Sequence, residues 1–245
     1  MVSLKRAFGA FVLAVGFSAT TMAAPVLIDD FNNPNGGSTV IRNTNGTSVQ
    51  SKTGAGILGN SREYSVTRTV GTIEAGTLNT TGSKHVFTVD NNSNTGRGLG
   101  RLHYDGNANG TFSNTGLNVD LTGGGTNTNF LFSDFIINAS NGNLTAQTMT
   151  TTVRDTLGNS FSYVELLKAQ DGVHIINFSV FTGVDFTKVA SLDFKFDNRN
   201  GAGIAGSDVE FSFLKATSGT PEPGTLVLAL TGAAGLAFIA RRKKS

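Results

Sequence analysis

Apolar and polar residues alternate along much of the chain, and this period of two constrains the fold more than any other feature of the sequence. Successive side chains of an extended strand point to opposite faces, so alternation predicts strands with one buried and one solvated face. Phe194-Lys195-Phe196 and Phe211-Ser212-Phe213 show the pattern clearly, because each pair of phenylalanines falls on one face. The alternating segments are residues 26–31, 62–70, 85–89, 129–137, 144–154, 160–167, 173–181, 189–196 and 208–214.

Clusters of small and polar residues separate these segments, at residues 91–96, 123–125, 141–143, 158–159 and 198–203. The dipeptides Asn141-Gly142 and Asp171-Gly172 predict tight hairpin turns. Between residues 24 and 220 no long segment keeps a helical period. About ten to twelve strands with such turns predict an all-β fold, a single β-sandwich of jelly-roll type over residues 24–220.

A right-handed β-helix is the alternative all-β fold, and it requires a repeat of about 20–30 residues. The only echo in the sequence is Val119-Asp120-Leu121-Thr122 against Val184-Asp185-Phe186-Thr187. Asp and Thr at such positions bond to their own backbone. We therefore interpret the echo as turn chemistry, not as a repeat.

The excess of positive charge in the chain lies at its two ends. Of nineteen Lys and Arg residues, two precede residue 25 and four follow residue 220, whereas only one of seventeen acidic residues lies outside those limits. Thirteen basic and sixteen acidic residues remain between them, so this segment has a net charge of −3. It lacks the basic surface that nucleic-acid binding requires. The absence of cysteine excludes disulfides and thiolate metal sites.

The N-terminal 23 residues have the three parts of a secretory signal. Lys5 and Arg6 are followed by an apolar run over residues 7–19, which is short for a membrane span. Small residues then predict cleavage by signal peptidase between Ala23 and Ala24. An uncleaved anchor is the alternative.

The C-terminal 25 residues also have three parts. Pro221-Glu222-Pro223 holds the chain extended, because proline forbids a helix through the motif. Residues 226–240 carry no charge and predict a short transmembrane helix of about 22 Å. Four basic residues beginning at Arg241 and Arg242 follow, and such a cluster stays in the cytoplasm. The predicted orientation places the body outside and the tip inside.

This C-terminal end resembles the PEP-CTERM sorting signal, on Pro221, Glu222, Pro223, Arg241 and Arg242. The resemblance implies recognition and cleavage by a membrane-embedded exosortase, in bacteria that make exopolysaccharide, with only transient membrane contact through residues 226–240. A plain tail anchor after a Pro-rich linker is the alternative. Residues 29–31, 116–122 and 207–211 look like the body of many PEP-CTERM proteins, which resembles lectin-like and carbohydrate-binding jelly rolls.

The sequence offers little catalytic chemistry. His85, His103 and His174 each lack a second histidine three or four residues away, so the di-histidine metal motif is absent. His85 and His174 fall in strand patterns and are expected to be structural. His103, Tyr104 and Asp105 are adjacent and form a candidate catalytic cluster, but the Asp105-Gly106 turn explains Asp105 equally well.

Paired carboxylates for glycosidase chemistry are also missing. Asp29 and Asp30 are neighbours, so a strand points them to opposite faces. Glu165 and Glu210 lie in separate strands, and nothing in the sequence places them about 5–10 Å apart. We therefore expect that the protein is not an enzyme.

Calcium is the metal that the sequence favours, because hard oxygen ligands suit an exported β-protein. Asp29 or Asp30 with Asp208 are candidate ligands if the first and last strands are neighbours. Plain solvated carboxylates are the alternative, and no other cofactor is expected.

The resemblance implies an exported, exosortase-processed protein of the cell envelope, cell surface or extracellular matrix, associated with exopolysaccharide and non-catalytic. A carbohydrate-binding module is the alternative. It would depend on hydrogen bonding more than on ring stacking, because the chain has no Trp and only three tyrosines, Tyr64, Tyr104 and Tyr163. A polysaccharide-degrading enzyme is the third hypothesis.

Overall fold

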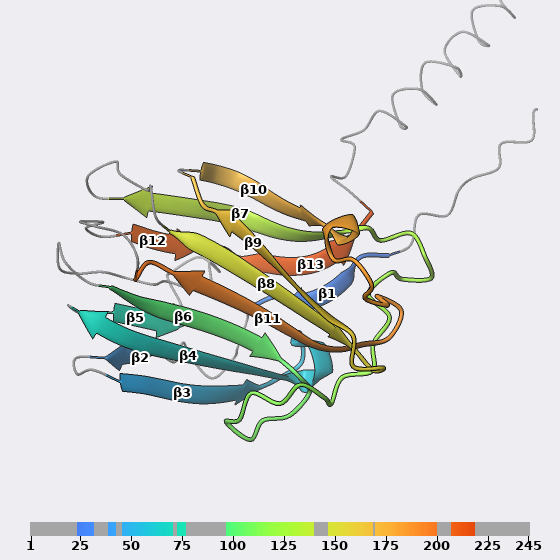
Figure 1. Ribbon diagram of the computed structural model, residues 1–245, viewed down its shortest axis with the longest axis horizontal. Helices are drawn as coiled ribbons and strands as arrows, with labels where there is room; N and C mark the ends of the chain where they lie inside the picture. Colours follow the sequence, from blue (N-terminus) through green and yellow to red (C-terminus); the bar gives the residue numbers. More distant parts are fainter. Residues whose placement is uncertain are drawn as a thin grey trace, which may run out of the picture.

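Two antiparallel β-sheets pack face to face in the computed structural model of the protein (Figure 1). The structure describes residues 24–31, 39–42, 46–70, 73–76, 97–139, 147–168, 170–199 and 207–218. Within these residues the chain forms thirteen strands and two short 3-10 helices, η1 (Leu58–Asn60) and η2 (Phe178–Val180).

The five-stranded sheet has the order β1-β13-β7-β10, and β12 also pairs with β7. Its strands are β1 (Val26–Asp29), β7 (Asn129–Ala139), β10 (Gln170–Asn177), β12 (Ser207–Glu210) and β13 (Phe213–Thr217). Among the described strands the first, β1, pairs with the last, β13, whereas Asp208 of the calcium hypothesis lies in β12, which pairs with β7.

The six-stranded sheet has the order β3-β4-β6-β11-β8-β9. Its strands are β3 (Gly46–Thr53), β4 (Ser61–Val70), β6 (Arg97–Tyr104), β8 (Thr148–Asp155), β9 (Ser160–Leu166) and β11 (Val189–Asp197). A separate pair is formed by β2 (Thr39–Arg42) and β5 (Ile73–Gly76).

Phenylalanines fill the space between the two large sheets. Phe132 of β7 meets Phe194 of β11 edge to face at a centroid distance of 5.5 Å, and meets Phe211 in the same way at 5.2 Å. All three rings are buried, and burying such a side chain contributes about 1.5–3 kcal/mol. The alternating pattern therefore supplies the core of a two-sheet sandwich. The all-β sandwich prediction is confirmed, and the β-helix alternative is wrong.

The hairpin predicted at Asp171-Gly172 is wrong. Both residues lie inside β10, which pairs with β7, whereas the preceding strand β9 belongs to the other sheet. Gly172 has a φ of +125°, and the register shifts between Gly172 and His174. The glycine thus serves a β-bulge and not a turn.

Asn141-Gly142 lies outside the described residues. The described strands on either side of it, β7 and β8, belong to different sheets. The predicted membrane-spanning residues 226–240 also lie outside the described part of the chain. In that part no helix has the length and hydrophobicity that crossing a membrane requires.

Candidate binding site

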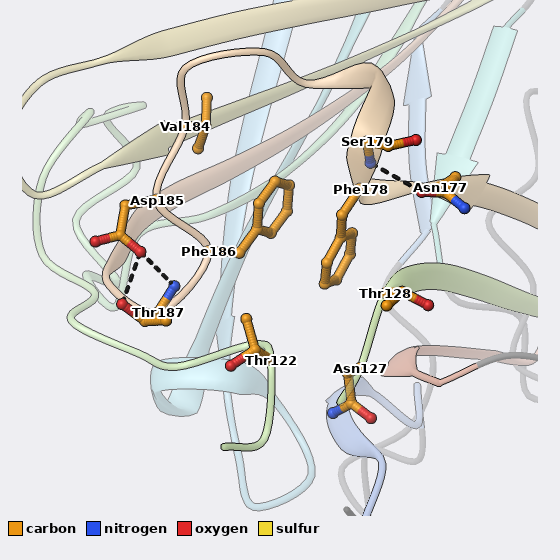
Figure 2. A pocket seen from close by; sticks show the side chains of 10 residues that line it. All are labelled: Thr122, Asn127, Thr128, Asn177, Phe178, Ser179, Val184, Asp185, Phe186 and Thr187. Carbon is orange, nitrogen blue, oxygen red and sulfur yellow. Dashed lines mark hydrogen bonds between the residues drawn. The ribbon is translucent and has the colours of Figure 1, made fainter. Parts of the chain in front are cut away.

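A pocket of about 430 Å³ opens between the loop that precedes β7 and the segment that follows β10 (Figure 2). Both segments join strands of the sandwich, so the two sheets position the walls of the pocket. The residues that line it are Thr122, Asn127, Thr128, Asn177, Phe178, Ser179, Val184, Asp185, Phe186 and Thr187.

Two stacked phenylalanines form the apolar part of the lining. The rings of Phe178 and Phe186 lie face to face, with centroids 4.0 Å apart and planes 11° apart. Phe130 packs against Phe178 at 4.8 Å and connects the pair to the core. Both pocket rings are largely buried, so this part of the pocket is rigid and apolar.

Asp185 and Thr187 form one wall through a local turn (Figure 2). Asp185 Oδ1 accepts hydrogen bonds from Thr187 N at 2.9 Å and from Thr187 Oγ1 at 2.6 Å. The hydrogen bond from the Thr187 side chain, and after it the one from the Thr187 backbone, lowers the pKa of Asp185. The carboxylate therefore stays ionised at neutral pH.

The opposite wall repeats this geometry at Thr122. Asp120 Oδ1 accepts from Thr122 N at 2.7 Å and from Thr122 Oγ1 at 2.5 Å. The side chain of Thr122 is the main cause of the lowered pKa of Asp120. Leu121 N donates to Phe186 O at 2.9 Å and holds the two turns side by side. The interpretation of the sequence echo as turn chemistry is confirmed.

Amide and hydroxyl groups complete the rim. Asn177 Oδ1 accepts from Ser179 N at 2.8 Å and caps η2 at its N-terminus. Phe178 N donates to Thr128 O at 2.7 Å, which fixes η2 against the loop before β7. The rim thus presents neutral polar groups on a backbone that is held at several points.

Asp155, at the end of β8, positions the Asp185 wall. Its buried carboxylate accepts from Leu157 N, from Asn159 N, from Asn159 Nδ2 and, at 3.2 Å, from Asp185 N. Burial opposes ionisation, but the bonds from Asn159, Asp185 and Leu157 outweigh it and lower the pKa of Asp155. Sequence reasoning missed this residue, although the turn Gly158-Asn159 that it organises was predicted.

Asp29, one of the predicted calcium ligands, is buried and already saturated with donors. Arg62 Nη1 reaches both of its oxygens, at 2.7 and 2.8 Å. Tyr104 OH donates to Oδ2 at 2.8 Å and Phe31 N to Oδ1 at 2.7 Å. The Arg62 guanidinium therefore supplies the positive charge that a calcium ion would bring to this carboxylate.

The other two candidates do not join Asp29. Asp208 pairs with Asn138 of β7, whereas Asp29 lies in register with Leu214, which pairs with Phe132 of the same strand. Six residues along β7 correspond to about 20 Å. Asp30 is half-buried near Gly56, whose carbonyl oxygen accepts from Asp30 N at 3.1 Å. The strand register therefore does not bring Asp29 and Asp208 together in one calcium site.

In the candidate catalytic cluster, Tyr104 lies apart from His103 and Asp105, which stay close to each other. Tyr104 points into the core and His103 to the outer face of the six-stranded sheet, because neighbouring strand residues alternate. Asp105 Oδ1 accepts from Asn107 N at 2.8 Å, as the turn explanation expects. His174 is a partly buried strand residue that stacks on Phe135 at 4.6 Å and lies 3.0 Å from Glu165 Oε1. His85 lies outside the described residues.

Residues 220–244 match the model of the PEP-CTERM protein-sorting motif. The chain carries a PEP-CTERM sorting signal. This confirms the predicted resemblance, and the motif implies processing by an exosortase and export to the cell surface. Ala23, Pro221, Glu222, Pro223, Arg241 and Arg242 lie outside the described residues, and Ala24 is the first described residue. A comparison with curated proteins finds no match to this chain.

Several solved β-sandwich structures are distantly similar to the body of this protein. The family 11 carbohydrate-binding module of the Clostridium thermocellum cellulase Lic26A-Cel5E has 12% identity over 80% of this chain and 95% of its own, with a TM-score of 0.36. The family 30 module of the C. thermocellum cellulase Cel9D-Cel44B has 15% identity over 75% of this chain and 99% of its own, with a TM-score of 0.35. These distant similarities assign no ligand to the pocket.

Proposed function

We propose that this protein is an exported, exosortase-processed and non-catalytic component of the cell surface or extracellular matrix, which binds a neutral exopolysaccharide through the pocket. Residues 1–23 are its export signal, removed between Ala23 and Ala24. Residues 24–220 form a single jelly-roll sandwich, and residues 221–245 form the sorting signal with its transmembrane helix and basic tip.

The lining of the pocket is the observation that carries the proposal. A sugar ring has an apolar face of C–H groups and an edge of hydroxyl groups. The edges of the stacked Phe178 and Phe186 rings suit the first, and the exposed amide and hydroxyl groups of Asn177, Thr128 and Ser179 suit the second. The volume of about 430 Å³ lies in the usual range for small-molecule sites and accommodates one or two sugar units.

The charge near the pocket favours a neutral glycan over an acidic one. Asp120 and Asp185 are both held ionised by their own turns, one beside each wall. A uronic acid would bring a third negative charge close to these carboxylates, and like charges repel. A polymer of neutral sugars avoids this cost.

The same carboxylates argue against polysaccharide cleavage at this site. Glycosidases need a protonated acid together with a second carboxylate about 5–10 Å away. Asp185 is the only carboxylate among the residues that line the pocket, and its lowered pKa keeps it from acting as a proton donor. Asp155 lies behind it but is buried and engaged by four donors. The pocket is therefore better suited to binding a polysaccharide than to cleaving it.

Affinity electrophoresis of the purified full chain, in gels containing either neutral or uronate-rich polysaccharide, tests the proposal. The variant Ser179→Trp fills the pocket from its exposed rim, and Ser160→Trp places the same ring on exposed β9 as the control. We expect the neutral polymer to retard the wild type and Ser160→Trp but not Ser179→Trp. Equal retardation of all three proteins would remove the pocket from the proposal. Release of shorter oligosaccharides would support the enzyme hypothesis instead.

A further inference from the structure

A second group of ionisable side chains lies on the outer face of the six-stranded sheet, outside the pocket lining. Glu63 of β4 and His103 of β6 are directly paired across the two strands, and Asp105 follows at the end of β6. One potential ligand atom from each residue lies within 4.8 Å of the other two. His103 Nε2 is 3.9 Å from Asp105 Oδ2.

The loop after β6 covers this group and removes it from solvent. The exposed fractions of Glu63, His103 and Asp105 are 0%, 1% and 0%. Phe112 of this loop lies edge to face with the His103 ring at 5.5 Å, and its ring is stacked by the Arg101 guanidinium at 3.9 Å. An outer sheet face normally contacts water, so burial of two carboxylates and an imidazole there requires an explanation.

Glu63 is the side chain that the protein alone does not satisfy. Among the described residues, no donor makes a hydrogen bond of acceptable geometry to either of its carboxylate oxygens. The His103 ring and the backbone amides of Gly110 and Thr111 approach this carboxylate, but the negative charge of Asp105 lies beside it as well. A buried carboxylate without such a partner is strongly destabilising unless a cation compensates it.

We propose that Glu63, His103 and Asp105 bind a divalent transition-metal ion of the zinc type. Two carboxylates and one imidazole match the nitrogen and oxygen ligands of Zn²⁺, whereas Ca²⁺ takes oxygen ligands only. The backbone carbonyl oxygen of Ser113, 2.7 Å from His103 Nε2, is a further potential metal ligand beside the site. A metal on Nε2 displaces the proton of that nitrogen, so the neutral ring carries its proton on Nδ1.

The surroundings of His103 suit this arrangement. His103 Nδ1 faces Asp193 Oδ1 at 3.8 Å, and a carboxylate on the far side of the imidazole is the usual partner of a metal-bound histidine. Asp193 is itself held by Arg101 at 2.6 Å and by Lys195 at 3.2 Å. The metal would fasten the loop over residues 105–117 to the sheet, and its role would be structural.

Zinc titration of the full chain, after removal of metals with EDTA, tests the proposal by calorimetry and thermal unfolding. The variants are Glu63→Gln and His103→Gln, and the control is Glu165→Gln, which alters the other His–Glu pair of the described residues. We expect the wild type and the control to bind one equivalent of Zn²⁺ and to gain melting temperature. Both ligand variants should bind at least about tenfold more weakly. Equal binding by Glu63→Gln, or no binding by the wild type, would overturn the proposal.

Two further readouts separate lost ligation from lost folding. Without metal, Glu63→Gln should melt no lower than the wild type, because it removes a buried charge that its surroundings compensate only in part. Chymotrypsin should cleave after Phe112 faster in the metal-free wild type than in the zinc-loaded one, whereas zinc should not protect Glu63→Gln. Zinc-independent cleavage in the wild type would contradict a metal that holds this loop.

Discussion

Arg62 Nη1 donates to both carboxylate oxygens of Asp29, at 2.7 and 2.8 Å, across the interior of the sandwich. The pair joins β1 of the five-stranded sheet to β4 of the six-stranded sheet, and its side chains are 1% and 0% exposed. Tyr104 of β6 also donates to this carboxylate. One ion pair thus fixes how the first strand lies against the other sheet.

Replacing Arg62 should destabilise the protein strongly. Arg62→Met leaves the Asp29 carboxylate buried without its cation, which costs about 3–5 kcal/mol of unfolding free energy. The control is Arg199→Met at the Arg199–Asp197 pair, where the arginine is 42% exposed and the expected loss is at most about 1 kcal/mol. Urea unfolding measures both. Equal losses for the two variants would show that the buried pair has no special role.

Removing both charges should restore part of that loss. In the double variant Asp29→Leu with Arg62→Met no buried charge is left uncompensated, and such replacements are often neutral or stabilising. We expect it to be more stable than Arg62→Met alone in the same urea experiment. A double variant that is less stable than the single one would indicate that Asp29 organises β1 independently of Arg62.

The sequence predicted strands with regular apolar alternation, such as β8, because its buried and partly buried residues follow the period of two. It missed β6, where Gly98 and Gly100 occupy buried positions and interrupt the pattern. It also misplaced Asp171-Gly172, since a bulge and a turn both require a residue that tolerates positive φ. The local amino-acid composition alone does not distinguish a β-bulge from a turn.

The candidate sites depended on pairing between distant segments, which one sequence does not show. The turns at Asp120 and Asp185 were predicted correctly one by one, but only the bond from Leu121 N to Phe186 O shows that they flank one pocket. Similarly, His103 and Asp105 were noticed, whereas Glu63 joins them only through the pairing of β4 with β6.

Phe186 should be essential for the stability of the pocket. Phe186→Ala removes the ring that stacks on Phe178 at 4.0 Å and leaves a cavity, so we expect a loss of about 3–5 kcal/mol. Phe213→Ala is the control, because that ring is 44% exposed on β13 and should cost less than about 1.5 kcal/mol. Thermal and urea unfolding compare the two. A loss for Phe186→Ala no larger than that of the control would argue against a rigid apolar wall.

Stability should depend on pH through Asp155. A lowered pKa means that the unfolded chain binds the proton more tightly than the native state does. The ionised carboxylate therefore contributes stability above its ordinary pKa of about 3.9, and this contribution is lost as pH falls through the lower native value. Asp155→Asn should be less stable than the wild type at pH 7, and the difference should shrink below about pH 4. A difference that stays constant across this range would contradict the account.

The sorting motif should determine the destination of the protein. Replacing Pro221, Glu222 and Pro223 with alanine removes the extended segment that the exosortase is proposed to recognise. We expect this variant to accumulate in the membrane fraction of the native host, still attached to residues 226–245. Cell fractionation followed by immunoblotting measures the distribution.

The matched control for this variant changes the basic tip and leaves the motif intact. Lys243 and Lys244 are replaced with alanine, while Arg241 and Arg242 keep the positive charge next to the apolar segment. The control should be sorted as the wild type is. If the variant without the motif also reached the surface in normal amounts, the motif would have no part in sorting.

The intact mass of the mature protein, isolated from the surface or medium of its native host, shows whether both signals are removed. We predict a chain that begins at Ala24 and ends near Pro221, without the apolar segment and basic tip. A mature protein that retains Arg241 and Arg242 would contradict processing by an exosortase and, with it, the proposed route to the cell surface.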